Sequence, residues 1–128
     1  MLEDIRSILV IDDEFDIVNP IKLSLKRQGF NAYGFTDPLL ALEHFKNNSE
    51  NIDLILCDIR MPQMNGYELV KKIKALQPKV RVILMSAFEI NDLEFSRVLP
   101  YVKIDGFISK PISLKKLTTR VKKYLNNS

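Results

Sequence analysis

The feature that most constrains the fold of this chain is an apolar run that ends in a carboxylate, Leu54-Ile55-Leu56-Cys57-Asp58. Runs of this length without alternating polar residues are typical of strands buried on both faces of a parallel sheet. Asp58 is then expected at the carboxyl end of the strand, which is the edge where open α/β sheets place their ligand sites. The loop that follows contains proline and an Asn-Gly pair, so a turn presents Asp58.

The rest of the chain repeats this pattern of a strand followed by a helix. The other predicted strands are Ser7–Ile11, Asn31–Phe35, Val80–Met85 and Phe107–Ser109. The predicted helices are Phe15–Gln28, Leu39–Asn47, Leu69–Leu76, Asn91–Val102 and a last helix capped by Ser113. Five such units predict one α/β domain over residues 1–128, with a doubly wound, five-stranded parallel sheet of flavodoxin-like (βα)5 type. The strand order expected for this type is 2-1-3-4-5.

Several local features of the helices follow from residue spacing. Pro20 lies inside the first predicted helix and is expected to kink it, although Asn19 would cap a shorter helix that starts at Pro20. His44 is expected to be exposed on the second helix and without partners. The predicted inward positions are Ile17, Ile21 and Leu25 in the first helix, Ala41, Leu42 and Phe45 in the second, Leu69, Val70, Ile73 and Leu76 in the third, and Leu114, Leu117, Val121 and Leu125 in the last.

Composition narrows the function classes. The 128 residues are 46% hydrophobic, enough for one globular core, and no apolar run approaches the length of a membrane span. The acidic start of the chain does not resemble a signal peptide, and the single cysteine, Cys57, cannot form an internal disulfide, so we expect a cytoplasmic protein. The net charge is +3, and we interpret the late lysines as a solvated helix face rather than a nucleic-acid site.

Polar side chains gather where the predicted strands end. Asp12 and Asp13 follow the first strand, Asp58 ends the third, Ser86 follows the fourth and Lys110 the fifth. Because the carboxyl ends of parallel strands share one edge of the sheet, these residues are expected on one rim. Clustered carboxylates suit a hard cation such as Mg²⁺, and a lysine and a hydroxyl suit phosphoryl oxygens. The pattern therefore predicts phosphoryl transfer to Asp58, because an aspartate can form an acyl phosphate.

These residues, in this order, resemble the receiver domain of two-component response regulators over essentially the whole chain. The matching motifs are the Asp12-Asp13 pair, Asp58, Met61-Pro62 with Gly66, Ser86-Ala87 and Lys110-Pro111, whose peptide bond is cis in the family. Phe107 stands where tyrosine is frequent in the family, and the segment from Ser86 to Lys110 is slightly long.

The resemblance implies specific roles for the rim. Asp58 would accept a phosphoryl group from a histidine kinase or phosphotransfer protein, with Ser86 and Lys110 binding phosphoryl oxygens. Asp13, Asp58 and the main-chain carbonyl of Arg60 would bind Mg²⁺ directly, and Asp12 largely through water. Phe107 would be the switch aromatic, so that the face formed by the fourth helix, last strand and final helix transmits the signal.

The resemblance also implies a regulator that catalyses only its own phosphorylation and dephosphorylation. Its effector is unknown, a homodimer is possible, and neither nucleic acid nor membrane is an expected partner. The chain is either a stand-alone regulator or a piece of a longer one.

Three other functions fit parts of the pattern. A phosphatase of the haloacid-dehalogenase type needs a second acid two residues after the nucleophile, where this chain has Arg60. A flavin-binding module needs a phosphate loop after the first strand, where Asp12, Asp13 and Glu14 would repel phosphate. A degenerate receiver that only binds proteins is opposed by the intact acid set and Lys110 and is tested by a phosphorylation assay.

Overall fold

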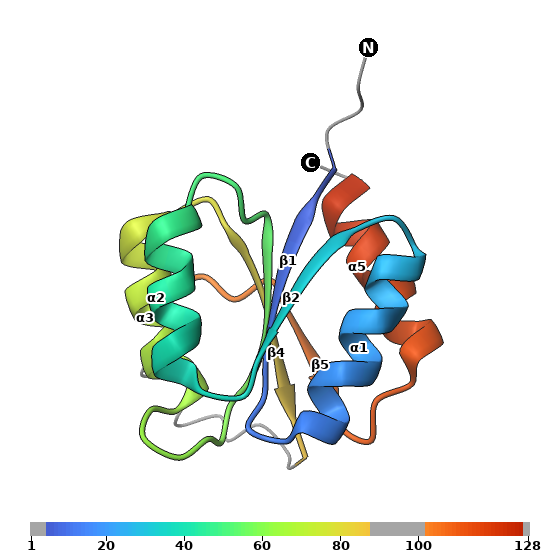
Figure 1. The fold of residues 1–128 in the computed structure, drawn as a ribbon, viewed down its shortest axis with the longest axis horizontal. Helices are drawn as coiled ribbons and strands as arrows, with labels where there is room; N and C mark the ends of the chain where they lie inside the picture. Colours follow the sequence, from blue (N-terminus) through green and yellow to red (C-terminus); the bar gives the residue numbers. More distant parts are fainter. Residues whose placement is uncertain (1–4, 88–101, 127–128) are drawn as a thin grey trace.

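A five-stranded parallel sheet forms the centre of the computed structural model, which describes residues 5–87 and 102–126 (Figure 1). The strands are β1 (Ser7–Ile11), β2 (Asn31–Phe35), β3 (Leu54–Asp58), β4 (Arg81–Ser86) and β5 (Gly106–Ser109). The helices are α1 (Phe15–Arg27), α2 (Pro38–Asn48), α3 (Gly66–Leu76) and α5 (Leu114–Asn126). The strand order β2-β1-β3-β4-β5 confirms the predicted doubly wound fold. The helix predicted at Asn91–Val102 lies outside the described residues, apart from Val102, which is buried.

Helices cover both faces of the sheet, with α2 and α3 on one side and α1 and α5 on the other (Figure 1). Every residue of β1 and β3 is buried, which explains why their sequences are apolar without alternation. Successive side chains of each strand enter two separate cores, so Leu9 and Ile55 face α2 and α3 while Ile8 and Leu54 face α1 and α5.

The register of the sheet aligns the carboxyl ends of the strands. Ile11 pairs with Cys57, Cys57 with Leu84, and Leu84 with Phe107. The next residues, Asp12 on the β1 side and Asp58 at the end of β3, therefore lie at the same level of the sheet. This alignment is what brings distant parts of the sequence to one rim.

Specific residues define the ends of the helices. Helix α1 runs continuously past Pro20, so the alternative of a helix capped by Asn19 is wrong. The helix ends at Arg27 and is followed by Gly29, whose φ of 95° places it in the left-handed region, and Phe30 N–H donates to Leu25 O as in a Schellman motif. Asp37 caps α2 by accepting from Leu39 N, and Asn65 caps α3 by accepting from Glu68 N.

The predicted inward faces are correct in the middle of each helix and wrong at two ends. Leu76 is 47% exposed and Leu114 is 38% exposed. Leu76 is the last residue of α3 and Leu114 the first of α5, so both errors lie at helix ends. Ile17 is only half-buried, near the start of α1. Within the described ranges, no helix combines the length and apolarity needed to cross a bilayer.

Candidate phosphoacceptor site

Asp12 is the most deeply placed carboxylate of the rim. It follows β1 and is fully buried. Its Oδ1 accepts a hydrogen bond from Glu14 N at 2.9 Å, and its Oδ2 lies 2.6 Å from Lys110 Nζ. Asp12 thus fixes the turn into α1. Glu14 occupies the N-cap position, but its side chain makes no capping bond.

Asp58 lies at the tip of β3 and is 5% exposed. Its Oδ1 is 3.2 Å from Lys110 Nζ. Burial and, next, repulsion from Asp12 raise the pKa of Asp58 to about 6, while Lys110 opposes the shift and Asp13 adds to it. The carboxylate is therefore mostly ionised at neutral pH and retains a basicity unusual for aspartate.

Three carboxylates come together at this rim. Asp12, Asp13 and Asp58 each present an oxygen, and these oxygens lie within 4.8 Å of one another. Asp13 is exposed and the other two are buried, so the group opens to solvent on one side. Lys110 is the cation found against this cluster in the described part of the chain, which leaves a negative excess suited to a hard divalent cation. The three carboxylates present fit a Mg²⁺ site, as expected from the acid cluster in the sequence.

Lys110 follows β5, the edge strand of the sheet, and its side chain extends to this cluster. Its main-chain N–H donates to Ser86 O at 2.7 Å, and the Lys110–Pro111 peptide bond is cis, as the resemblance implied. Burial alone would lower the pKa of Lys110, but hydrogen bonds and ion pairs with Asp12 and Asp58 reverse this and raise it. The side chain therefore stays protonated and supplies a fixed positive charge.

The remaining predicted residues surround the opening of the site. Ser86 ends β4 and is buried, whereas Arg60 is exposed. Both line a cavity of about 140 Å³ together with Asp13, Glu14, Asp58, Ala87 and Lys110. Glu14 was not among the predicted site residues, although its place directly after two aspartates could have indicated this position.

Glycine at position 66 allows α3 to start against the back of the site. Gly66 N–H donates to Ile59 O at 2.7 Å, and a Cβ atom at Gly66 would lie 2.3 Å from Asp58 O. Any larger residue would push the start of α3 away from the phosphoacceptor strand. The glycine belonged to the predicted motif, and the structure supplies its physical reason.

Phe107 lies on β5, away from the opening. Its half-buried ring packs against the core beneath α2 and α3, and its carbonyl accepts from Arg120 Nη1 at 2.6 Å. Tyr124 donates to Asp105 O at 2.8 Å, and a Cβ at Gly106 would clash with Tyr124 Oη at 2.4 Å. Helix α5 is therefore attached to β5 through two main-chain carbonyls on either side of a glycine, a link that the sequence did not reveal.

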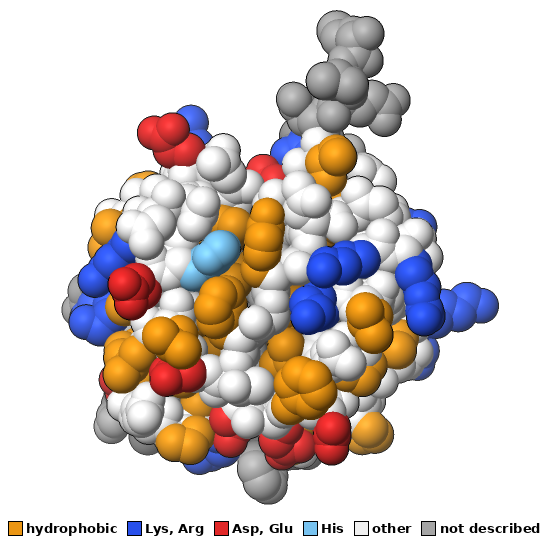
Figure 2. Space-filling model, in the orientation of Figure 1, with side chains coloured by type: hydrophobic (Ala, Val, Ile, Leu, Met, Phe, Trp, Pro, Cys, Tyr) orange, Lys and Arg blue, Asp and Glu red, His pale blue; other side chains and the backbone are white. Residues whose placement is uncertain are grey.

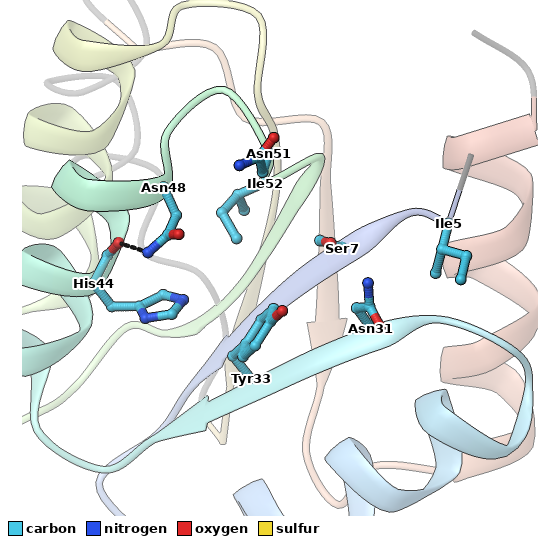
Figure 3. Close-up of a pocket in the computed structure, with 8 residues that line it drawn as sticks. All are labelled: Ile5, Ser7, Asn31, Tyr33, His44, Asn48, Asn51 and Ile52. Carbon is cyan, nitrogen blue, oxygen red and sulfur yellow. Dashed lines mark hydrogen bonds between the residues drawn. The ribbon is translucent and has the colours of Figure 1, made fainter.

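A second, larger cavity of about 320 Å³ lies at the opposite, amino end of the strands (Figure 3). His44 lines it and packs between the rings of Tyr33 and Phe35, at centroid distances of 5.0 and 5.1 Å. The expectation that His44 is exposed and without partners is wrong, because the rings of β2 cover it. The cavity contains no residue of the rim.

Comparisons with known proteins agree with this geometry. The sequence model of the family described as "Response regulator receiver domain" matches residues 8–122. The chain is 32% identical over 124 residues to the alkaline phosphatase synthesis transcriptional regulatory protein PhoP of Bacillus subtilis, covering 96% of this chain and 50% of that protein. It is 29% identical over 121 residues to sporulation initiation phosphotransferase F of the same organism, covering 94% of each. The chain thus spans about half the length of PhoP and nearly all of the phosphotransferase.

Solved structures are similar over nearly the whole chain. A response regulator receiver domain protein from Clostridium thermocellum matches with a TM-score of 0.84 and 25% identity, covering 96% of each chain. The structure of a CheX-CheY-BeF3-Mg complex from Borrelia burgdorferi matches with a TM-score of 0.81 and 29% identity, covering 94% of this chain and 89% of that one.

Proposed function

We propose that this chain, which belongs to the response regulator receiver domain family, is a phosphorylation-controlled switch whose Asp58 accepts a phosphoryl group. The observation that carries the proposal is the position of Asp58 at a strand tip, 3.2 Å from Lys110 and within a group of three carboxylates. The donor would be the phosphohistidine of a kinase or phosphotransfer protein, or a small acyl phosphate.

The chemistry follows from the residues of the rim. A carboxylate oxygen of Asp58 attacks phosphorus, the bond from phosphorus to the donor nitrogen breaks, and the donor imidazole leaves with the electron pair. Because the pKa of Asp58 is about 6, the attacking group is mostly ionised at pH 7 without prior proton removal. Lys110 and the Ser86 hydroxyl would bind phosphoryl oxygens. Hydrolysis of the acyl phosphate later returns the carboxylate.

Mg²⁺ would be held by Asp13, Asp58 and the main-chain carbonyl of Arg60, with Asp12 acting largely through water. When bound, the ion neutralises charge between the carboxylates and the incoming phosphoryl group. Asp13→Asn removes a ligand and should weaken Mg²⁺ binding about tenfold or more while the fold remains intact. An unchanged Mg²⁺ affinity in a titration would exclude Asp13 as a ligand.

A neighbouring apolar cavity supports a docking position for the phosphodonor protein. The cavity, of about 300 Å³, lies between α1 and the start of α5 and includes Pro20, Ile112 and Leu114. Lys110 also lines it, so a partner seated there would be next to the phosphoacceptor site. Leu114→Asp should then slow transfer from a phosphorylated partner protein and leave the reaction with acetyl phosphate unchanged.

The direct test is the intact mass after incubation with acetyl phosphate and Mg²⁺. The parent protein should gain one phosphoryl group, and Asp58→Asn should gain none. Asp16→Asn, an exposed acid on α1 outside the cluster, is the matched control and should behave like the parent. An unmodified parent would favour a receiver-like module that only binds proteins, and a modified Asp58→Asn would refute the assignment of the site.

A further inference from the structure

Basic side chains are concentrated on one side of the molecule. Helices α1 and α5 together carry eight lysine and arginine residues and one acid, Asp16. Since the whole chain has a net charge of +3, the remainder is net negative. In Figure 2 blue side chains gather on the right over α1 and α5, red side chains lie along the lower rim, and both colours occur together on the left.

Six of these cations form what we call the basic face. Its members are the exposed residues Lys26, Arg27, Lys115, Lys116, Lys122 and Lys123. None of the six has an ion-pair partner among residues 5–87 and 102–126, whereas Arg6 and Lys110 are paired with acids. Like charges without counter-charges repel one another, so an external anion would stabilise this arrangement.

The spacing on α5 is regular. Lys115 and Lys122 are seven residues apart, as are Lys116 and Lys123. Two helical turns separate the members of each pair, which is about 10.5 Å along the axis. The buried residues Leu117, Val121 and Leu125 anchor the opposite side of α5 to the sheet, so the two lysine rows have a fixed direction.

We propose that the basic face binds an acidic helix of a partner protein, with carboxylates repeating every seven residues opposite the lysine rows. A partner helix with this repeat has the same axial spacing as α5. Sequence-specific binding of nucleic acid fits less well, because five of the six cations are lysines, which provide point charges rather than the bidentate contacts that arginine makes with bases. The aromatic ring on the described part of α5, Tyr124, is half-buried and its hydroxyl is bound to Asp105 O, so it offers no platform for base stacking. The proposal does not depend on phosphorylation of Asp58.

The test uses the whole chain and a synthetic helical peptide of about 21 residues, with glutamates on one face at heptad spacing. Binding is measured at low and at high salt. The parent should bind the peptide, and added salt should weaken the complex. The double variant Lys116→Glu with Lys123→Glu should bind about tenfold more weakly or worse.

Three comparisons make the result decisive. The control variant Lys46→Glu with Lys72→Glu reverses the same number of charges, but on α2 and α3. Its affinity for the peptide should differ from that of the parent by less than about threefold. A peptide of the same composition with dispersed glutamates should bind more weakly than the helical one. Equal loss in both variants, equal binding of the two peptides, or absence of binding at low salt would overturn the proposal. Tighter binding to duplex DNA or to phosphatidylserine vesicles than to the peptide would also overturn it.

Discussion

The ammonium of Lys110 lies 2.6 Å from a carboxylate oxygen of Asp12, closer than its 3.2 Å approach to Asp58. Asp12 follows β1 and Lys110 follows β5, so this contact crosses the rim over the ends of two intervening strands. Because Asp12 is fully buried, removing Lys110 would leave its carboxylate without the cation that now lies against it. Lys110 therefore has a structural role in addition to the proposed contact with phosphoryl oxygens.

Two substitutions of Lys110 separate these roles. Lys110→Met leaves Asp12 without its cation and should lower the free energy of unfolding by about 2–3 kcal/mol without metal. The same variant should bind Mg²⁺ more tightly, because a competing cation is gone. Lys110→Arg keeps the charge but changes reach and geometry. It should bind Mg²⁺ within about threefold of the parent yet respond poorly to phosphorylation. A normal response of the arginine variant in a partner-binding assay would refute the phosphoryl contact.

The pKa of Asp58 makes the stability of the metal-free protein depend on pH. The folded-state pKa of Asp58 is about 6 and the ordinary pKa of an aspartate is 3.8, so the folded state favours the protonated form. The ionised Asp58 therefore destabilises the folded state at pH 7.5. This destabilisation decreases as the pH falls through 6, and it is gone below the pKa of the unfolded state. Asp58→Asn removes the penalty at every pH. The variant should be more stable than the parent by about 1 kcal/mol at pH 7.5, allowing for water at the opening of the site.

Thermal unfolding of both proteins at pH 5 and pH 7.5, with chelator present, checks this sign. The stability gap between variant and parent should shrink at pH 5. If the stability of Asp58→Asn relative to the parent instead increased on acidification, the pKa of Asp58 would be lowered rather than raised.

Two glycines allow steric and conformational effects to be compared. Gly66→Ala would place a Cβ atom against the main chain of Asp58 and should destabilise the fold by about 2 kcal/mol. Gly29→Ala meets nothing within 4 Å, but its φ of 95° is unfavourable for alanine, so it should cost about 1 kcal/mol. Phosphorylation by acetyl phosphate should slow in the first variant and remain unchanged in the second. Equal rates in both would show that α3 does not need to approach Asp58 closely.

Much of the rim could be predicted from sequence because two simple rules act together. A strand buried on both faces is apolar without alternation, and parallel strands end on one edge. Asp12 and Asp58 lie at the ends of two such runs, and Lys110 follows the short edge strand β5, so their proximity follows from the parallel fold. The closer pairing of Lys110 with Asp12 rather than Asp58 was not predictable, because it depends on how far the lysine side chain reaches across the ends of the two intervening strands.

The other features that were predicted wrongly or not at all also depend on tertiary contacts. His44 has no sequence neighbour that would bury it, and only the pairing of β2 with the sheet brings Tyr33 and Phe35 over its ring. Leu76 follows the helical repeat, but it is the last residue of α3 and is exposed. The attachment of Arg120 and Tyr124 to β5 joins residues 13 and 19 positions apart, a distance over which spacing carries no signal.

Phe107 provides the last prediction, which concerns signal output. Phosphorylation of Asp58 would draw the Ser86 hydroxyl toward a phosphoryl oxygen and open space behind β4, where the ring of Phe107 can enter. The ring is already half-buried against the core, and it lacks the hydroxyl that would favour an outward position. The unmodified protein should therefore populate the inward state in part. Phosphorylation should shift this population by a coupling of about 1–3 kcal/mol.

Amide spectra of β5 and α5 with and without beryllofluoride measure this shift. Arg120 binds the carbonyl of Phe107, so movement of β5 should also perturb α5. Phe107→Tyr adds a hydroxyl that favours the outward state, and the change on adding beryllofluoride should become larger. Tyr124→Phe breaks the bond to Asp105 O and should reduce the response of α5 while that of β5 persists. If β5 and α5 are unperturbed while Asp58 is occupied, transmission does not pass through Phe107.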